Sequence, residues 1–202
     1  MAMNFLSKFV EQFKKPAGCM GRLAGLLMAG EPAKSVWTVS LLNLRKDDWA
    51  LEVGFGPGRA IESLSRTITE GRIVGIDISS VMLRQAKKRN KEAIENGVVD
   101  LILADVSSPP PFKRKFDHIL SINNIMFWEE PVDSLKKLQK LLKPEGKIAI
   151  TVQPRMRGAD QNTVKEFGQQ IKENLQAAGY RNIHTHIRQM KPVNCVCVTA
   201  TI

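Results

Sequence analysis

Three glycines lie within five residues in the stretch LEVGFGPGRA, at positions 54, 56 and 58. The stretch follows a short apolar run, which is the form of a turn from a strand into a helix. Gly54 and Gly56 can adopt positive φ values, and neither has a Cβ atom that would keep a ligand away from the backbone. Pro57 presets the first helical turn, and Gly58 removes a side chain where the helix begins. Such a loop is typical of a site for a nucleotide-like ligand.

The spacing of these glycines argues against two common nucleotide sites. A dinucleotide site has the pattern G-x-G-x-x-G, and its third glycine would fall at position 59, which is Arg59. A mononucleotide phosphate loop needs the sequence G-K-[ST], which the stretch does not contain. An NAD-dependent oxidoreductase therefore stays as a distant alternative, as does a tight turn that binds no ligand.

Two aspartates end segments that look like strands. Asp77 ends GRIVGID and could accept hydrogen bonds from two ribose hydroxyls. Asp105 ends VVDLILAD and could accept a hydrogen bond from an adenine amine. Aspartates at strand ends also cap the turn or helix that follows, so this structural role stays open for both residues.

Alternating strands and helices must position these residues. From residue 48 onward, strands are predicted at WALEVG, GRIVGID, VVDLILAD, FDHILSI and KIAITVQ, with helices between most of them. Two later strands, RNIHTHIRQM and VNCVCVTATI, are joined by a link that is long enough only for an antiparallel turn. In a parallel sheet, ligands bind beyond the carboxyl ends of the strands. The glycine loop, Asp77, Asp105 and residues 121–124 should therefore share one rim.

Four segments in this order resemble the class I S-adenosylmethionine-dependent methyltransferases, in their small-molecule, methyltransferase-11-like branch: LEVGFGPG, GIDISSVMLRQA, LILADVSSPPPFKRKFDHILSINNIMFWEEP and LLKPEGKIAIT. The resemblance covers about residues 48–152. It implies an α/β fold, which is a Rossmann-like, doubly wound, mostly parallel seven-stranded sheet with an antiparallel C-terminal edge strand. Residues 1–47 would form an N-terminal helical lid that supplies the substrate pocket, and residues 48–202 the S-adenosylmethionine-binding domain, in one compact unit.

The resemblance also implies S-adenosyl-L-methionine as cofactor and S-adenosyl-L-homocysteine as product. The methionine part would lie against Glu52, Gly54, Gly56 and Gly58, and the ribose would be held by Asp77. The adenine would contact Ile78, Met82, Asp105 and Val106. The amino-acid end and the sulfonium would lie beside Ser121 and Asn123. Met82 has an equally good interpretation as a core residue of a helix.

The implied reaction is an in-line displacement, in which an acceptor atom attacks the methyl group of the sulfonium. Many small-molecule members carry histidines just before the tryptophan of NNIMFWEEP, whereas this chain has Met126 and Phe127 there. The catalytic residue is therefore unknown, and its weak candidates are Asn123, Asn124 and Glu129. A solvated acid at a helix start is the simpler interpretation of Glu129.

The acceptor pocket is expected to use the N-terminal segment and the end of the fourth strand. Its candidate residues are Arg22, Trp37, Met126 and Trp128. Arg22 could pair with an anionic group of the substrate or with the cofactor carboxylate. Ordinary packing is the alternative for the apolar candidates. We interpret the three histidines as structural or surface residues, namely His118, His184 and His186.

Composition and charge limit the remaining function classes. The chain has 202 residues, of which 43% are hydrophobic, and this suits one folded domain. A net charge of +10 keeps RNA or another macromolecule as an alternative acceptor, although the basic residues are spread along the chain and no aromatic platform accompanies them. A non-catalytic S-adenosylmethionine-binding module is a further alternative, because the expected base is missing.

Cysteines and hydropathy add expectations about location and metals. Three cysteines cannot all pair within the chain, and no second Cys or His cluster has a ligand spacing, so no metal site is expected. Cys195 and Cys197 are predicted to be buried on one face of a strand. The longest apolar runs are too short to cross a bilayer and no secretory signal is evident, so we expect a cytoplasmic protein. The small-molecule substrate is what the family resemblance implies. The sequence does not indicate an oligomeric state.

Overall fold

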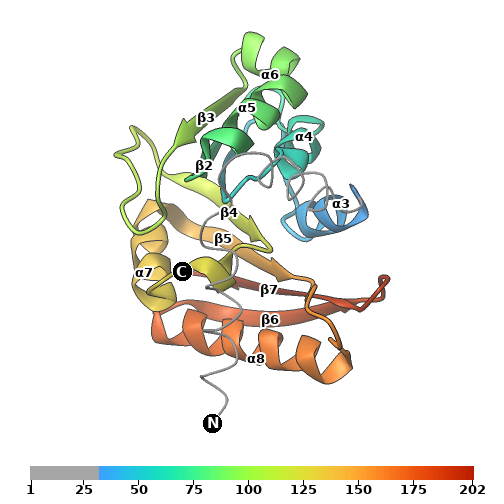
Figure 1. Ribbon diagram of the computed structural model, residues 1–202. Helices are drawn as coiled ribbons and strands as arrows, with labels where there is room; N and C mark the ends of the chain where they lie inside the picture. Colours follow the sequence, from blue (N-terminus) through green and yellow to red (C-terminus); the bar gives the residue numbers. More distant parts are fainter. Residues whose placement is uncertain (1–31) are drawn as a thin grey trace.

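A seven-stranded sheet runs through the part of the chain that the computed structural model describes, residues 32–202 (Figure 1). Its strands are β1 (Trp49–Val53), β2 (Arg72–Asp77), β3 (Val99–Leu103), β4 (Phe116–Ile122), β5 (Leu142–Val152), β6 (Arg181–Arg188) and β7 (Cys195–Thr201). The helices are α3 (Pro32–Ser40), α4 (Arg59–Ser65), α5 (Ser80–Arg89), α6 (Lys91–Glu95), the short 3₁₀ helix η1 (Ile125–Phe127), α7 (Pro131–Leu141) and α8 (Gln161–Ala177). The strand order is β3-β2-β1-β4-β5-β7-β6.

The strand directions confirm the predicted fold class. Strands β1 to β5 pair in parallel, so that their carboxyl ends meet at one rim. Strand β7 runs antiparallel to both β5 and β6. The expectation that this antiparallel strand forms the edge is wrong, because β7 lies between β5 and β6. The apolar strand takes the inner place: Cys195 to Ala200 are buried, whereas most of β6 is exposed.

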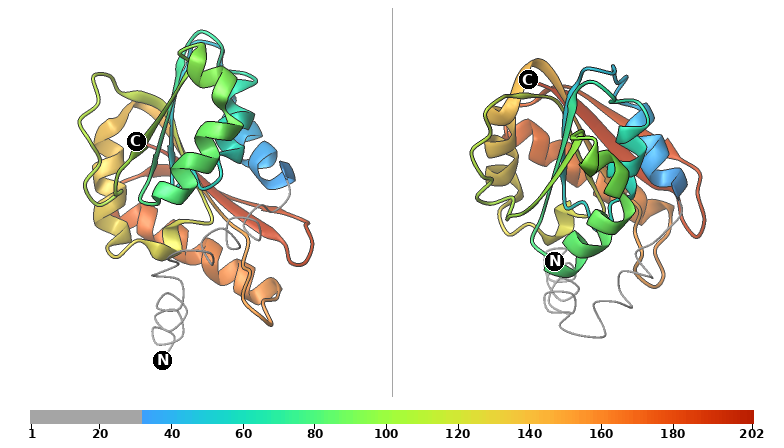
Figure 2. Two further views of the ribbon diagram at one scale, coloured as in Figure 1. Left: turned by 45° about the horizontal axis from the view of Figure 1, so that its top comes forward. Right: turned by 90° about the horizontal axis from the view of Figure 1, so that it is seen from above.

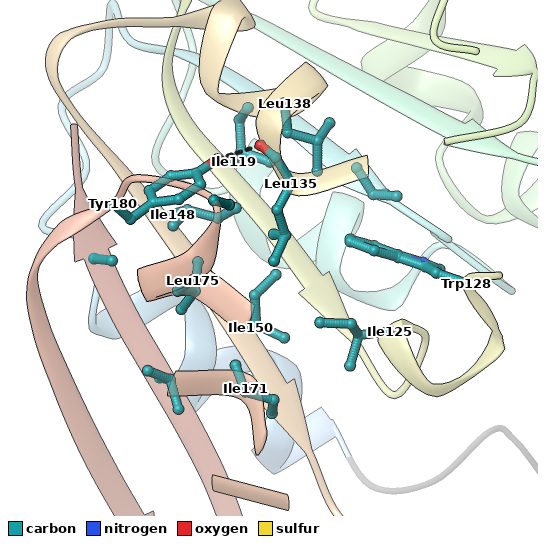
Figure 3. Close-up of a cluster of buried hydrophobic side chains, with 14 of the residues drawn as sticks. Ile119, Ile125, Trp128, Leu135, Leu138, Ile148, Ile150, Ile171, Leu175 and Tyr180 are labelled. Atoms are coloured by element: carbon teal, nitrogen blue, oxygen red, sulfur yellow. Dashed lines mark hydrogen bonds between the residues drawn. The ribbon is translucent and has the colours of Figure 1, made fainter. Parts of the chain in front are cut away.

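Apolar side chains form a core on each face of the sheet, and Figure 2 shows the two helical layers from two further sides. On one face, α7 and α8 pack against β4, β5 and β7, as the close-up in Figure 3 shows. There the buried hydroxyl of Tyr180 donates a hydrogen bond to the carbonyl oxygen of Leu135 at 3.1 Å. On the other face, α3, α4 and α5 pack against the sheet, and the buried cysteines Cys195 and Cys197 belong to this second core, as predicted.

The segment between β2 and β3 departs from the expected single helix. It breaks into α5 and α6 at Asn90, whose side chain is buried. The Nδ2 atom of Asn90 donates to the carbonyl oxygens of Ala86 and Gly58, at 2.9 and 3.1 Å. A side chain that bonds the backbone of the preceding turn competes with helix continuation. The break therefore also ties the end of α5 to the glycine loop.

Helix α3 belongs to the folded core, although it lies in the segment expected to form a lid. Its Thr38 is buried and shares a 2.8 Å hydrogen bond with Thr151 of β5. Most of the expected lid, residues 1–31, lies outside the described residues. Among residues 32–202, no helix has the length and apolar character needed to cross a membrane.

Strand β2 supports the glycine loop at Gly75, which has no side chain. A Cβ atom on Gly75 would lie 2.7 Å from Cδ1 of Phe55 and 2.8 Å from Cδ2 of Leu101. Phe55 stands between the first two glycines of the loop and is 3% exposed. Its ring therefore anchors the loop in the space that Gly75 leaves on β2.

We expect Gly75→Ala to destabilise the protein by about 1–3 kcal/mol, because the added methyl group overpacks this contact. Chemical denaturation of the variant and of the wild type measures the difference. The double variant Gly75→Ala/Phe55→Leu should recover part of the loss, since the smaller side chain gives the methyl group room. Strictly additive effects of the two substitutions would contradict the proposed contact.

Candidate active site

The glycine loop after β1 turns through three left-handed residues. The φ values are 72° at Gly54, 50° at Gly56 and 79° at Gly58, a conformation that favours glycine. A Cβ atom on Gly54 would lie 2.2 Å from Cγ of Asn124, so this glycine lets the loop approach the end of β4. A Cβ atom on Gly56 would meet nothing within 4 Å. The middle of the loop therefore faces open space, where a ligand can approach the backbone.

Asp77, at the end of β2, is bonded to two backbone segments. Its Oδ2 accepts a 2.9 Å hydrogen bond from the N–H of Gly56, and its Oδ1 accepts one of 2.8 Å from Ser79. The side chain is 9% exposed, and burial raises its pKa while these two hydrogen bonds lower it. Asp77 thus has the capping role that the sequence left open. A carboxylate has about four lone-pair positions, so acceptor capacity remains for a ligand.

Glu52 is a buried acid beneath the same loop. It is 3% exposed, and its Oε2 has no hydrogen-bond partner within residues 32–202. Burial raises its pKa well above the ordinary value, the nearby charge of Asp77 raises it further, and a hydrogen bond from the N–H of Ile61 opposes both. Two neighbouring buried carboxyl groups of this kind do not both ionise readily. The pair therefore favours a nearby positive charge.

Next to Asp77, the rim offers an exposed apolar side chain and a second acid. Ile78 is 73% exposed, unusually open for its type, whereas Met82 lies in the second core. Asp105 is exposed, and its Oδ1 accepts a 2.7 Å hydrogen bond from the N–H of Ser107. Val106 is buried in the first core. The structure thus places Ile78 and Asp105 on the same rim as Asp77, beyond β2 and β3.

The end of β4 is closed by hydrogen bonds among residues expected at the sulfonium. Ser121 is fully buried, and its Oγ donates to the carbonyl oxygen of Val53 at 2.9 Å. Asn123 has a φ of 52°, and its Oδ1 accepts a 2.7 Å bond from the N–H of Gln153. Asn124 accepts a hydrogen bond from the indole N–H of Trp128. These side chains fix the ends of β1, β4 and β5 relative to one another.

The structure does not bring all the expected pocket residues together. Trp128 is buried in the first core (Figure 3). Met126 is partly buried and packs against the same core. Trp37 is buried in the second core, on the opposite face of the sheet. Glu129 is exposed next to Trp128, and Arg22 lies outside the described residues.

The three histidines lie away from the glycine loop. His118 is partly buried in β4, and its Nε2 is 2.9 Å from Oδ2 of Asp48, at the amino end of β1. His184 and His186 lie on β6, where His186 bonds the hydroxyl of Thr199 at 3.0 Å. These positions agree with the interpretation of all three as structural or surface residues.

Sequence reasoning missed two polar residues at the rim. Lys34 of α3 is 7% exposed and donates a 3.4 Å hydrogen bond to Oε1 of Gln153, just beyond β5. Neither residue belongs to a motif, and lysine and glutamine are ordinarily surface residues. The one available signal was the position of Gln153 as the last residue of the predicted strand KIAITVQ, which should end at the rim.

Comparisons with known proteins identify the family of this chain. A family model described as a methyltransferase domain matches residues 51–150. The Bacillus subtilis protein YdaC, which is named as a methyltransferase, is 35% identical over 179 residues, a match that covers 88% of this chain and 97% of YdaC.

Solved structures share the fold. A SAM-dependent methyltransferase from Aquifex aeolicus has a TM-score of 0.69 and 21% identity, with 98% of both chains covered. The [4+2]-cyclase SpnF has a TM-score of 0.64 and 22% identity, over 77% of this chain and 60% of SpnF. The ordered rim motifs, the family model and the near full-length match to YdaC agree. The chain therefore belongs to the S-adenosylmethionine-dependent methyltransferases, and S-adenosylmethionine is its cofactor.

Proposed function

We propose that this methyltransferase acts on a small-molecule acceptor, and that the rim beyond β1, β2 and β3 binds the cofactor. The observation that carries the cofactor part is the left-handed glycine loop, held by Asp77 and open at Gly56. The bound cofactor supplies a methyl group on a positive sulfonium, which already activates it for displacement. The protein then has to align the acceptor and exclude water.

The residues on the rim fit this cofactor. The acceptor capacity left on Asp77 suits two ribose hydroxyls. Ile78 offers an exposed apolar surface for the adenine, and Asp105 lies on the adenine side of the same rim. The orphaned Oε2 of Glu52 offers negative charge beneath the loop, on the side proposed for the methionine part. The remaining cofactor residues are proposed from their positions around these groups: Gly54, Gly58, Met82, Val106, Ser121 and Asn123.

The distribution of basic residues supports a small acceptor over RNA. The densest cluster, Arg84 to Lys91, lies on α5 and the start of α6, beside β2 and β3 (Figure 1). A second cluster, Lys113 to Lys115, directly precedes β4 and thus lies at the amino ends of the parallel strands, opposite the rim. Neither basic cluster lies on the side proposed for the acceptor, beyond β4 and β5, which contains the apolar Met126 and the buried lysine Lys34.

We assign no general base. Asn123 and Asn124 each use the side-chain oxygen in a hydrogen bond within the protein, and Glu129 is exposed. An acceptor that is already a good nucleophile needs no base, because the donor is activated. Asn123, Asn124 and Glu129 therefore remain weak candidates.

Asp77→Asn should weaken S-adenosylmethionine binding roughly tenfold to a hundredfold, because hydrogen bonds to a charged acceptor become bonds to a neutral one. Titration calorimetry of the full-length protein measures the affinity. Asp100→Asn is the matched control: it removes an exposed aspartate that pairs with Arg72 on the neighbouring strand, and the affinity should stay within about twofold. Unchanged binding by Asp77→Asn would show that the ribose lies elsewhere.

Binding of S-adenosylmethionine should also release protons. Burial raises the pKa of Glu52, so the free protein holds this proton at pH values above the ordinary pKa of a glutamic acid. Because the sulfonium and ammonium groups are positive, the carboxylate form is favoured in the complex. Affinity should therefore rise with pH until the raised pKa of the free protein is passed.

Calorimetry in buffers of different ionisation enthalpy counts the released protons. Glu52→Gln, which cannot ionise, should lower the number of protons released. The same measurement on Asp77→Asn shows how many of the remaining protons come from Asp77. An unchanged count in Glu52→Gln would refute the assignment of the proton to this residue.

Transfer of labelled methyl groups into cell extract tests the acceptor class. We expect the label in low-mass material, with the amount unchanged when the extract is first treated with nuclease. Label that enters RNA and disappears after nuclease treatment would favour the macromolecular alternative, which rests on the net charge of +10. A protein that binds the cofactor and labels nothing would favour a non-catalytic module.

A further inference from the structure

A lysine ammonium is held in a fixed polar setting where β5 ends. Lys34 of α3 is 7% exposed, and its Nζ donates to Oε1 of Gln153 at 3.4 Å. The Nε2 of Gln153 donates to the carbonyl oxygens of Lys191 and Val193, at 3.1 and 2.9 Å. Its backbone N–H donates to Oδ1 of Asn123. Because these bonds fix the amide group, its oxygen has to face the ammonium.

No counter-charge for Lys34 is found within residues 32–202. The pKa of Lys34 is lowered to about 8, mainly by burial and also by the positive charge of Arg155, whereas Cys195 acts in the opposite direction. Burial raises the pKa of the Cys195 thiol to about 12, so this group stays neutral at physiological pH. No carboxylate contributes among the described residues. An ammonium also has three N–H donors, and the described residues accept from one of them.

The position of Lys34 separates it from the proposed cofactor site. Strand β5 is two places from β1 in the sheet, and β7 is three places away. Since neighbouring strands lie about 4.8 Å apart, Lys34 is on the order of 10 Å from the strand that carries the glycine loop. The ammonium thus lies on the β4–β5 side of the rim, where the proposed function places the acceptor.

We propose that the buried ammonium of Lys34 binds an anionic group of the methyl acceptor, so that the acceptor is a carboxylate or a phosphate ester. This inference rests on the proposed small-molecule function. A carboxylate or phosphate oxygen supplies the missing counter-charge and accepts the remaining N–H bonds of the ammonium.

The first test follows the titration of Lys34 by NMR in full-length protein that contains ¹³C-labelled lysine and is saturated with S-adenosylhomocysteine. The Lys34 signal is identified by its loss in Lys34→Met. Addition of acetate or inorganic sulfate in place of chloride should move the titration midpoint from about 8 to about 9 or higher, because the bound anion stabilises the ammonium. The signal of Lys147, a partly buried lysine in the middle of β5, should not respond.

The outcomes separate two sources of the anion. If neither acetate nor sulfate moves the midpoint, the proposal is wrong. If S-adenosylhomocysteine alone raises it and the added anions have no further effect, the ammonium serves the cofactor carboxylate, and the acceptor proposal is again wrong. Failure of S-adenosylhomocysteine to bind would instead overturn the cofactor site on which the inference depends.

The second test uses the reaction. Low-mass cell extract is separated on an anion exchanger before incubation with protein and methyl-labelled S-adenosylmethionine. Acceptor activity should be in the retained fractions, and Lys34→Met should lower labelling at least about tenfold, the effect of losing one charged hydrogen bond. S-adenosylhomocysteine affinity should stay within about twofold in this variant, and Lys147→Met, the matched control, should label normally. Acceptor activity that flows through the exchanger, or full labelling by Lys34→Met, would overturn the proposal.

Discussion

The hydrogen bonds of the Asp77 carboxylate hold the rim together. One oxygen binds the glycine loop after β1, and the other binds the turn that begins α5. The parallel pairing of β1 with β2 brings these two loops to the same end of the sheet, and the carboxylate then fixes the distance between them. The Phe55 ring beside Gly75 and the hydrogen bond from Asn90 to the carbonyl oxygen of Gly58 hold the same loop. The proposed cofactor site depends on this connection, because the bond from the N–H of Gly56 to Asp77 holds the open part of the loop in place.

Much of this arrangement could be predicted from the sequence, because it follows from backbone geometry. The glycine spacing and the apolar strands predict the left-handed loop and the parallel order of β1 to β5, and the structure confirms both. The place of β7 could not be predicted in the same way. Two strands joined by a short link can pair with either one against β5, and the difference in burial between β6 and β7 decides which one lies inside.

The chemistry of individual side chains was the least predictable part, because it depends on neighbours that are distant in sequence. Trp128 belongs to the motif NNIMFWEEP and is itself an expected pocket residue, yet it is buried in the first core. Lys34 and Gln153 are 119 residues apart, and no local pattern indicates that they meet. The raised pKa of Glu52 likewise depends on burial and on Asp77. Each of these results needs the packed tertiary structure.

The inner position of β7 has a consequence for folding during synthesis. Strand β6 leaves the ribosome before β7, but its neighbour in the sheet is β7. Until β7 emerges, β6 has no partner in the described sheet, and the apolar edge of β5 is uncovered. The glycine loop and Asp77, which lie on earlier strands, do not share this delay. We therefore expect the cofactor half of the sheet to form first, with unpaired strand edges exposed until β7 is inserted.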